Sequence, residues 1–308
     1  MRLQLFALSC VLSLWLVAVA QALDPEPVTF TTYDGQVIRA DYYARQATET
    51  GAPMAILLHM YRGNRTAYQP LIDPLHQAGF AVLALDLRGH GESGDEDARA
   101  RVVKGETAVF EEMREDLRAA YNWFAEQPGI DRSRFALVGA SIGCSVALNY
   151  AADDKSVDVL VLLSPGVDYL GLDSRRPMRE IKGRKIWMIS GNKPKEKQAL
   201  AALKKLAPEA KTEVLAGDHH GTHMFGPIPG LEQRIAQYLK ANVGKPTNTT
   251  VFGSIRSKIY HLTGSGWIEQ IRPWNMRHYS SPAEAQSRGL REAKNRGPND
   301  RPGKANRP

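Results

Sequence analysis

Short runs of apolar residues recur along the central part of the chain, without the polar alternation that a half-exposed strand would show. Such runs are typical of strands that are buried on both faces of a parallel sheet. They are Met54–His59, Ala81–Leu85, Phe135–Val138, Val157–Leu163, Lys185–Ser190 and Thr212–Leu215. Nearer the start, Val28–Thr32 and Val37–Tyr43 alternate apolar and polar residues around Asp34-Gly35, and this pattern predicts a β-hairpin.

Apolar positions at helical spacing fall between these predicted strands. The clearest case is Phe110–Gln127, and Lys195–Leu206 and Leu231–Leu239 show the same kind of pattern. Strands that alternate with helices predict an α/β fold with a mostly parallel twisted sheet and helices on both faces. Only residues 164–184 separate two of the strands, so we expect no sizeable lid there and a shallow, accessible site.

The first 22 residues differ in character from the rest. They contain one early arginine, an apolar run and the small-residue ending Ala20-Gln21-Ala22. This pattern is typical of a secretory signal peptide that is cleaved after Ala22. We therefore expect a periplasmic or secreted protein with no transmembrane segment after cleavage. A retained membrane anchor is the alternative, but the apolar run is barely long enough to cross a bilayer.

The chain has two cysteines, and the first of them, Cys10, lies inside the predicted signal peptide. The mature protein would therefore have no internal disulfide and would depend on core burial for its stability. Cys144 falls on the first turns of a predicted helix, where we expect a packed and unreactive thiol.

The positive charge of the chain is concentrated at one end. The formal net charge of the 308 residues is +7. From Ala241 onward there are 12 Lys and Arg against 4 Asp and Glu, a net of +8, which leaves 28 basic and 29 acidic residues before that point. This asymmetry predicts a separate basic segment. We divide the chain into a signal peptide (1–22), an α/β domain (23–242), a linker (243–250), a small basic C-terminal module (251–296) and a disordered tail (297–308).

The segment Arg134–Leu148 combines a buried strand, a G-x-S-x-G turn and a helix of small residues. Ser141 lies where the chain must reverse from strand to helix, and Gly139 and Gly143 allow the two elements to approach closely. Such a turn raises a serine hydroxyl above a parallel sheet and directs helix N–H groups toward it. The segment predicts a nucleophilic serine, and a structural turn with an incidental serine is the alternative.

A loop after the last predicted strand holds three histidines, His219, His220 and His223. Acyl transfer through serine needs a base to take the hydroxyl proton, and a histidine on such a loop could supply it. A three-histidine metal site is the alternative. However, the spacing lacks the i, i+4 pair of a helical zinc motif and includes a glycine. We therefore expect neither a metal nor a cofactor.

Two further motifs lie in the order that a known family shows. His59–Gly63 (HMYRG) follows the first predicted parallel strand, and Asp86–Ser93 (DLRGHGES) closes the next one. Together with the serine turn and the histidine loop, they make the chain resemble the α/β-hydrolase superfamily. In particular, it resembles secreted lid-less members similar to dienelactone-hydrolase-like esterases. The resemblance runs from about Val28 to Leu239.

This resemblance assigns roles to individual residues. It implies that Ser141 is the nucleophile and that His220 is the general base, since His-Gly after a glycine-rich loop is the usual form of the family. It also implies that the backbone N–H groups of Ile142 and Tyr61 form the oxyanion hole, where removal of one donor costs roughly 2.7–4 kcal/mol in other enzymes. The segment Asp86–Ser93 is expected to shape a loop beside the site.

The catalytic acid is missing from the place that the family pattern gives it. The family has an aspartate in a G-x-x-D loop, and this chain has Pro194 at that position. Three carboxylates could replace it: Glu196, two residues further on, Asp168, after the preceding strand, and Asp218. We favour Glu196 over Asp168, and we regard Asp218 as geometrically awkward because it is so close in sequence to the histidine.

The C-terminal module resembles the metal-binding domain of bacterial methylphosphotriester DNA-repair proteins. The matching parts are Ser257–His261, Trp267, the helix start Ser281–Ala285 and Gly289. Cysteines carry the metal chemistry of that domain, and this chain has Ser265 and Arg296 where two of them would be expected. Zinc binding is therefore not implied.

Aromatic residues are interleaved with the basic residues of the module. They are Tyr260, Trp267, Trp274 and Tyr279. Such a surface could hold a polyanion or single-stranded nucleic acid. We favour the alternative, in which the aromatics form the module's own core, because so short a segment needs most of them there. The predicted export signal makes envelope polyanions a more available partner than nucleic acid.

Two functions remain open at this point. The first is an exported serine hydrolase, of carboxylesterase type, that acts on a small-molecule ester through an acyl-enzyme on Ser141. The second is a catalytically weak hydrolase scaffold that binds an envelope polyanion or another partner through its basic module. The displaced acid and the separated charge favour the second, and the order of motifs favours the first.

Overall fold

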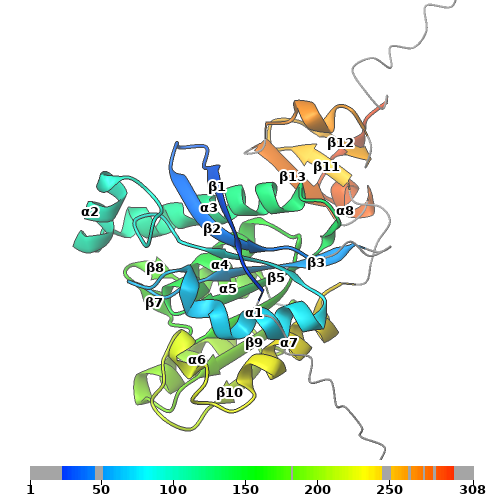
Figure 1. The fold of residues 1–308 in the computed structure, drawn as a ribbon. Helices are drawn as coiled ribbons and strands as arrows, with labels where there is room; N and C mark the ends of the chain where they lie inside the picture. Colours follow the sequence, from blue (N-terminus) through cyan, green and yellow to red (C-terminus); the bar gives the residue numbers. More distant parts are fainter. Residues whose placement is uncertain are drawn as a thin grey trace, which may run out of the picture.

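The computed structural model describes residues 23–45, 51–181, 183–244, 251–262, 265–272, 275–279 and 282–294 (Figure 1). The predicted signal peptide, most of the predicted linker and the predicted tail lie outside these residues. Within the described residues, no helix combines the length and the apolar character that a membrane span requires.

An eight-stranded sheet forms the centre of the larger domain. In spatial order its strands are β1 (Glu26–Thr31), β2 (Val37–Tyr43), β4 (Ala81–Leu85), β3 (Ala52–Leu58), β5 (Ile130–Ala140), β6 (Val157–Leu163), β9 (Lys185–Ser190) and β10 (Lys211–Val214). The β1–β2 and β2–β4 pairs are antiparallel, and all the other pairs are parallel. The mostly parallel sheet and the N-terminal hairpin predicted from the sequence are confirmed.

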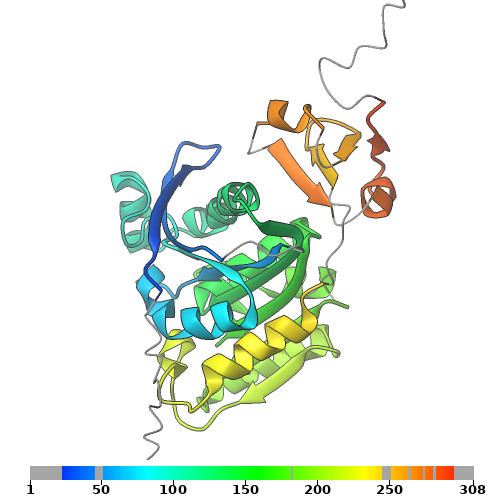
Figure 2. The ribbon, with the colours of Figure 1, turned by 45° about the vertical axis from the view of Figure 1, so that its right-hand side comes forward.

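Helices cover both faces of this sheet. One face carries α1 (Gln69–Ala78) and α7 (Leu231–Asn242), which lie side by side in Figure 2, and the other carries α3 (Thr107–Ala125) and α4 (Ile142–Asp153). The remaining elements of this domain are α2 (Glu96–Lys104), α5 (Arg175–Glu180), α6 (Pro194–Leu206), the short strands β7 (Asp168–Tyr169) and β8 (Leu172–Asp173), and the 3-10 turns η1 (Arg65–Tyr68) and η2 (Gly221–Met224).

The two-sided cover explains why the strand sequences are apolar throughout. Along β3, Ile56 and Leu58 pack with α3 and α4, whereas Ala55 and Leu57 face α1 and α7. Because successive side chains of a strand point to opposite faces, a strand between two helical layers must be apolar at every position.

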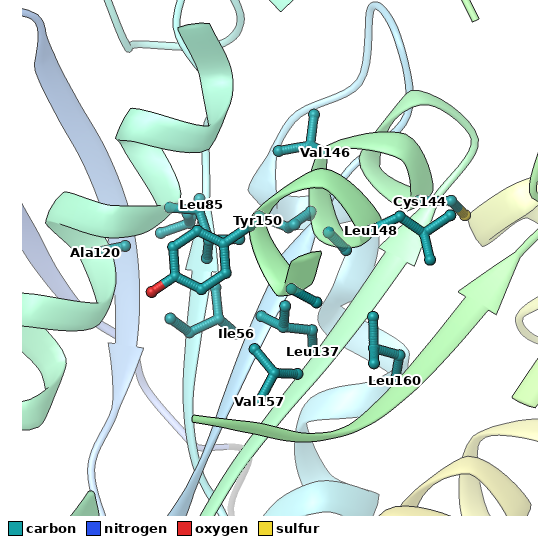
Figure 3. Close-up of a cluster of buried hydrophobic side chains, with 14 of the residues drawn as sticks. Ile56, Leu85, Ala120, Leu137, Cys144, Val146, Leu148, Tyr150, Val157 and Leu160 are labelled. Atoms are coloured by element: carbon teal, nitrogen blue, oxygen red, sulfur yellow. The ribbon is translucent and has the colours of Figure 1, made fainter. Parts of the chain in front are cut away.

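The thiol of Cys144 lies inside one of these layers. Figure 3 shows it on α4 among apolar side chains, with Leu148 on the same helix and Leu160 on a strand below. Its Sγ donates to the carbonyl oxygens of Gly139 and Leu163, at 3.2 and 3.3 Å. Burial raises the pKa of this thiol well above its ordinary value. The prediction of a packed cysteine is confirmed.

The C-terminal module is a second, smaller sheet with its own core. Its strands are, in spatial order, β13 (Met276–Tyr279), β11 (Val251–Ser254), β12 (Ile259–Leu262) and β14 (Arg291–Glu292), accompanied by η3 (Ile268–Gln270) and α8 (Pro282–Ser287). Val251, Tyr260 and Ala285 form the buried centre. Figure 2 shows the module beside the larger domain, which it meets at the start of β5, where the Arg132 guanidinium lies 4.6 Å from the Phe252 ring centroid.

Candidate active site

Ser141 lies in a strained turn between β5 and α4. Its φ is +53° and its ψ is −116°, a conformation that non-glycine residues rarely adopt and that typically costs 1–3 kcal/mol. The flanking glycines leave space for the turn, since a β-carbon at Gly139 would lie 2.4 Å from the Gly143 carbonyl oxygen. One at Gly143 would lie 2.3 Å from the Leu58 carbonyl oxygen. The G-x-S-x-G spacing thus allows α4 to begin against the end of β3.

The loop after β3 reaches the same edge of the sheet as the serine turn. Leu58 pairs with Gly139 in register, so the loop His59–Gly63 begins beside the residue two before Ser141. The loop is closed by the Gly63 N–H, which donates to the Met60 carbonyl at 2.8 Å. Tyr61 lies inside this turn, and Ile142 is the first residue of α4, where backbone N–H groups have no partner within the helix. The two amides that the sequence nominated as oxyanion donors therefore lie in neighbouring loops.

His220 is bonded to Glu196. The ring Nδ1 of His220 lies 2.9 Å from Glu196 Oε1, and the glutamate side chain is only 9% exposed. Pro194 begins α6 and Glu196 lies in its first turn. The acid has thus moved two residues into the helix, and the longer glutamate side chain spans the added distance. Of the three carboxylates considered from the sequence, the structure brings Glu196 to the histidine.

The histidine loop itself lies against the serine turn. A β-carbon at Gly221, the residue after His220, would lie 3.4 Å from Ala140 Cβ, next to Ser141. It would also lie 2.4 Å from Met60 Sδ in the oxyanion loop. The structure therefore brings together the three loops on which the sequence placed the nucleophile, the base and the oxyanion donors.

Ser164 was not identified from the sequence, although it links the acid to the histidine loop. Its Oγ donates to Glu196 Oε2 at 2.8 Å and accepts from the Gly221 N–H at 3.0 Å. The Gly191 N–H also donates to Glu196 Oε2, at 3.1 Å. Both carboxylate oxygens are therefore engaged, which fixes the side chain with one oxygen directed at His220.

Tyr169 was also missed, and it covers part of the site. Its hydroxyl donates to the Ser164 carbonyl at 2.9 Å, and its ring meets the His220 ring edge-on, with centroids 6.5 Å apart. Burial, and to a lesser extent the Cys144 thiol, raise the pKa of the phenol, while hydrogen bonding to the Ser141 side chain lowers it in part. Tyr169 therefore lies within reach of both Ser141 and His220.

The β7–β8 hairpin that carries Tyr169 changes one expectation. No large lid is inserted between β6 and β9, as the sequence predicted. The site is nevertheless not shallow, because this hairpin covers it and Ser141 retains only 6% of its accessible surface. A connection this short covers the site because its residues pair as a hairpin, which its length alone does not indicate.

The other candidate residues lie away from this bond network. Asp168 is exposed, and its Oδ1 accepts from the Gly171 N–H at 2.9 Å within the hairpin turn. Asp218 and His223 are exposed as well. Within the described part of the chain, no three His, Cys, Asp or Glu side chains are grouped as a metal site requires.

The Asp86–Ser93 segment has the structural role that its sequence suggested. Arg88 is buried and its Nε donates to Asp116 Oδ1 at 2.7 Å, while its Nη1 reaches Asp34 Oδ2 at 2.6 Å. Asp86 accepts from the backbone N–H groups of Arg65 and Glu92, at 2.7 and 2.9 Å. These bonds hold the loop next to the oxyanion turn without placing a reactive group in it.

A mostly parallel sheet, a strained serine on a strand-to-helix turn and a histidine–carboxylate pair after later strands define an α/β hydrolase. The comparison with protein families agrees. The model for serine aminopeptidase, family S33, matches residues 53–215, which is just over half of the chain. The chain belongs to this family.

Several curated proteins match parts of the chain. A polyketide transferase from Penicillium sp is 32% identical over 167 residues, or 53% of this chain and 52% of its own. A thiohydrolase from Aspergillus aculeatus is 28% identical over 142 residues, or 46% of this chain and 42% of its own. An uncharacterized Escherichia coli protein is 34% identical over 110 residues, or 35% and 36% of the two chains. The chain thus spans about a third to a half of these curated relatives.

Solved structures resemble the fold over a larger share. An esterase from Pyrococcus furiosus superposes with a TM-score of 0.57 at 22% identity, covering 72% of this chain and 94% of its own. An acetyl xylan esterase from Paenibacillus sp. R4 gives a TM-score of 0.59 at 17% identity, covering 73% and 85%. At such identities the likeness shows the fold alone. The resemblance of the C-terminal module to a DNA-repair domain stays a prediction.

Proposed function

We propose that the protein is an exported serine hydrolase of carboxylesterase type. The observation that carries the proposal is the Glu196–His220 bond of 2.9 Å on a loop that lies against the strained Ser141 turn. A nucleophile, a base and an orienting acid are the three parts that acyl transfer through serine requires. The esterases among the similar folds add support for an ester substrate.

In the first half of the reaction, Ser141 Oγ attacks the ester carbonyl carbon while His220 Nε2 takes the hydroxyl proton. The Ile142 and Tyr61 N–H groups donate to the developing alkoxide. The carbon–oxygen bond to the alcohol then breaks, and His220 returns its proton to the leaving oxygen. Glu196 accepts from Nδ1–H throughout, which keeps Nε2 free to face the serine.

The second half repeats the chemistry with water. Water loses a proton to His220 and attacks the acyl carbon, and the proton then passes to Ser141 as the acid leaves. The buried Glu196 stabilises the imidazolium in both halves, and the Ser164 and Gly191 donors hold its carboxylate in position.

A fluorophosphonate probe tests the nucleophile. We expect it to label the parent protein and not Ser141→Ala, whereas Ser145→Ala, which changes a buried serine one turn along α4, should be labelled like the parent. Labelling that survives in Ser141→Ala would refute the assignment.

A matched pair of glutamate variants tests the acid. Glu196→Gln should lower kcat on p-nitrophenyl butyrate by about 10²- to 10⁴-fold, since loss of the orienting acid has effects of that size in other triads. Glu232→Gln alters an equally buried glutamate whose Oε1 accepts from Gly226 N–H, remote from His220, and should leave kcat unchanged. Faster turnover of an aminoacyl p-nitroanilide than of the ester would redirect the proposal from esterase to peptidase.

Export belongs to the same proposal, and it rests on residues 1–22 alone. The full chain expressed in a bacterium should appear in the periplasm or medium, with a mature N-terminus at Leu23 by Edman sequencing. A cytoplasmic protein that still begins with Met1 would contradict it.

The alternative of a weak binding scaffold had two motives, the missing acid and the separated charge. Glu196 removes the first motive, because a carboxylate is bonded to the base. The charge of the module remains to be explained, and it leads to a separate inference.

A further inference from the structure

The C-terminal module contains a cavity that takes no part in the proposed reaction. Its volume is about 440 Å³, within the range of small-molecule sites. The side chains that define its chemistry are Ser254, Arg256, Ser257, His261, Trp267 and Arg272. No carboxylate is among the described residues that line it. The cavity therefore combines two guanidinium groups, several polar donors and one aromatic ring.

Backbone hydrogen bonds hold the walls of this cavity. The turn after β11 is closed by the Ser257 N–H, which donates to the Ser254 carbonyl at 3.0 Å. The Ile255 N–H donates to the Asn275 carbonyl at 2.8 Å and so ties this turn to the segment before β13. The third wall, which carries Trp267, is a 3-10 turn whose Ile271 N–H donates to the Ile268 carbonyl at 3.0 Å. A site with such walls exists before a ligand arrives, which lowers the entropic cost of binding.

His261 lines this cavity with a partly buried imidazole ring. Its Nδ1 is buried and has no hydrogen-bond partner within the described residues. Burial lowers the pKa of the ring, so the imidazole is neutral near pH 7 and one of its nitrogens carries a proton to donate. Because Nδ1 is enclosed by protein, the ring nitrogen that would serve a ligand in the cavity is Nε2.

We propose that this cavity binds a small ligand that carries a tetrahedral oxyanion, a phosphate or sulfate ester. The guanidinium groups of Arg256 and Arg272 would bind the oxyanion, for which their planar donor geometry is suited, and the Ser257 hydroxyl and His261 would add neutral donors. The Trp267 ring would cover the apolar or aromatic part of the same ligand.

The site is independent of Ser141. The module meets the larger domain at the start of β5, through Arg132 and Phe252, and Ser141 follows the other end of that strand. The register with β3 pairs Ile130 with Ala52 and Gly139 with Leu58, so at about 3.3 Å per residue the sheet separates these two points by roughly 20 Å. The ligand of the module is therefore a second ligand, distinct from the ester that the serine would attack.

Titration calorimetry on the full-length protein tests the proposal, with phenyl phosphate, phenyl sulfate, inorganic phosphate and a heparin oligosaccharide as probes. We expect one phenyl phosphate or phenyl sulfate per chain, bound more tightly than inorganic phosphate because only the esters reach Trp267. The stronger of the two esters identifies the oxyanion. Ser141→Ala should bind like the parent, so failure of the proposed hydrolysis would not affect this result.

Variants separate the cavity from the general charge of the module. Arg256→Ala and Arg272→Ala should each weaken binding of the preferred ester by about tenfold or more, the size of a lost charged hydrogen bond. Trp267→Ala should remove the preference for the ester over inorganic phosphate, and Trp267→Phe should retain most of it. Arg291→Ala changes an exposed arginine of β14, outside the cavity, and should bind like the parent.

Three outcomes would overturn the proposal. The first is that neither ester binds at ligand concentrations up to about 10 mM. An affinity weaker than this would not indicate a specific site. The second is equal loss of binding in Arg291→Ala and Arg256→Ala. The third is binding of heparin alone, lost with added salt, which would assign the basic residues to a surface for polyanions.

Discussion

Ser164 is bonded to four segments around the His220–Glu196 pair. Its φ of +54° is a strained value, yet every polar group it carries is bonded. Its N–H donates to the Ile189 carbonyl at 2.6 Å, and its carbonyl accepts from the Tyr169 hydroxyl at 2.9 Å. Its Oγ joins Glu196 to Gly221. Backbone strain persists only where surrounding bonds determine the conformation, and such residues cluster at functional sites.

Replacement of Ser164 by alanine should therefore affect turnover more than binding. The variant leaves the Gly221 N–H without its acceptor and takes one donor from a buried carboxylate, at a cost of about 1–3 kcal/mol. We expect kcat to fall by about tenfold or more with KM nearly unchanged, because the acid and the histidine loop lose their shared anchor.

The control is Ser145→Ala, which removes a buried hydroxyl bonded to Ser174 Oγ at 2.8 Å on α4. It should lower the urea midpoint by a comparable amount and leave kcat as in the parent. Equal kcat values in the two variants would reduce Ser164 to a purely structural residue.

A second prediction at the residue scale concerns pH. Burial, and then the neighbouring His90 ring, lower the pKa of His59 to about 4. In the unfolded chain His59 binds a proton near pH 6.5, whereas in the folded chain it stays neutral at that pH. The stabilisation is therefore complete above pH 6.5 and is lost as the pH falls toward 4. Between about pH 7 and pH 5 the free energy of unfolding should drop by about 2 kcal/mol from this residue alone.

Urea unfolding of the parent and of His59→Gln at both pH values measures this contribution. For each protein, the change in the free energy of unfolding between the two pH values gives a slope. The difference between the parent and variant slopes isolates His59, because other buried groups are common to both chains. Asp158 is one of them, and its pKa, which burial raises to about 6, acts in the opposite direction. Parallel slopes for the parent and the variant would show that His59 binds a proton equally in both states.

How far the site could be read from the sequence depended on how local each signal was. Ser141 and His220 lie in short motifs whose glycines indicate a tight turn. Both could therefore be nominated from the sequence. Glu196 could only be favoured over other carboxylates, because it lies two residues beyond the family's aspartate position and its longer side chain has to span that shift. Ser164 gave no signal because its Oγ meets Gly221 across 57 residues, and Tyr169 gave none because its ring meets His220 on another loop.

Among the helices and strands, those with a strong apolar pattern were found and those shaped by packing were not. The pattern did not reveal α1, which has Pro74 inside it, or α2, which buries only Ala98 and Val102. β5 begins at Ile130, five residues before the predicted start, because Arg132 and Arg134 interrupt the apolar run. The C-terminal module contacts this polar extension through Arg132. The arginine that interrupts the apolar pattern is therefore also a contact residue of the module.

The β7–β8 hairpin yields a prediction at this scale. Its turn is attached to α3, since Thr107 Oγ1 donates to the Leu170 carbonyl at 3.1 Å. A β-carbon at Gly171 would lie 2.3 Å from that same Oγ1, at a φ of +84°. Gly171→Ala should therefore move the hairpin, displace Tyr169 from His220 and change KM for the ester several-fold.

Gly183→Ala is the matched control for this variant. Gly183 has a similar φ of +90°, but a β-carbon there would meet nothing within 4 Å. It should incur only the backbone cost, about 1 kcal/mol, with normal kinetics. A Gly171→Ala enzyme with normal KM would mean that the hairpin does not contribute to the substrate site.

On the scale of the whole molecule, the chain is divided both in charge and in packing. The two large hydrophobic clusters are built from residues before position 244, while Val251, Tyr260 and Ala285 form a third cluster. The charge follows the same division, with a net of −1 before Ala241 and +8 from there on. Separate cores and opposite charge balance are the features expected of two units with different ligands.

A chain that ends at Gly244 should therefore fold and keep the proposed esterase activity. Val243 packs against the second core, and the Gly244 N–H donates to Asp158 Oδ2 at 3.1 Å, so both interactions remain. What is lost is the contact with the module, where Arg132 lies over the buried Phe252 ring and β13 packs against β5. Calorimetry should show a melting temperature within a few degrees of the same domain in the full chain.

A chain that ends at Asn242 loses both retained interactions and should melt lower than the Gly244 form. If the Gly244 form were unfolded or inactive, the module would be part of the catalytic unit and the division drawn from charge and packing would be wrong.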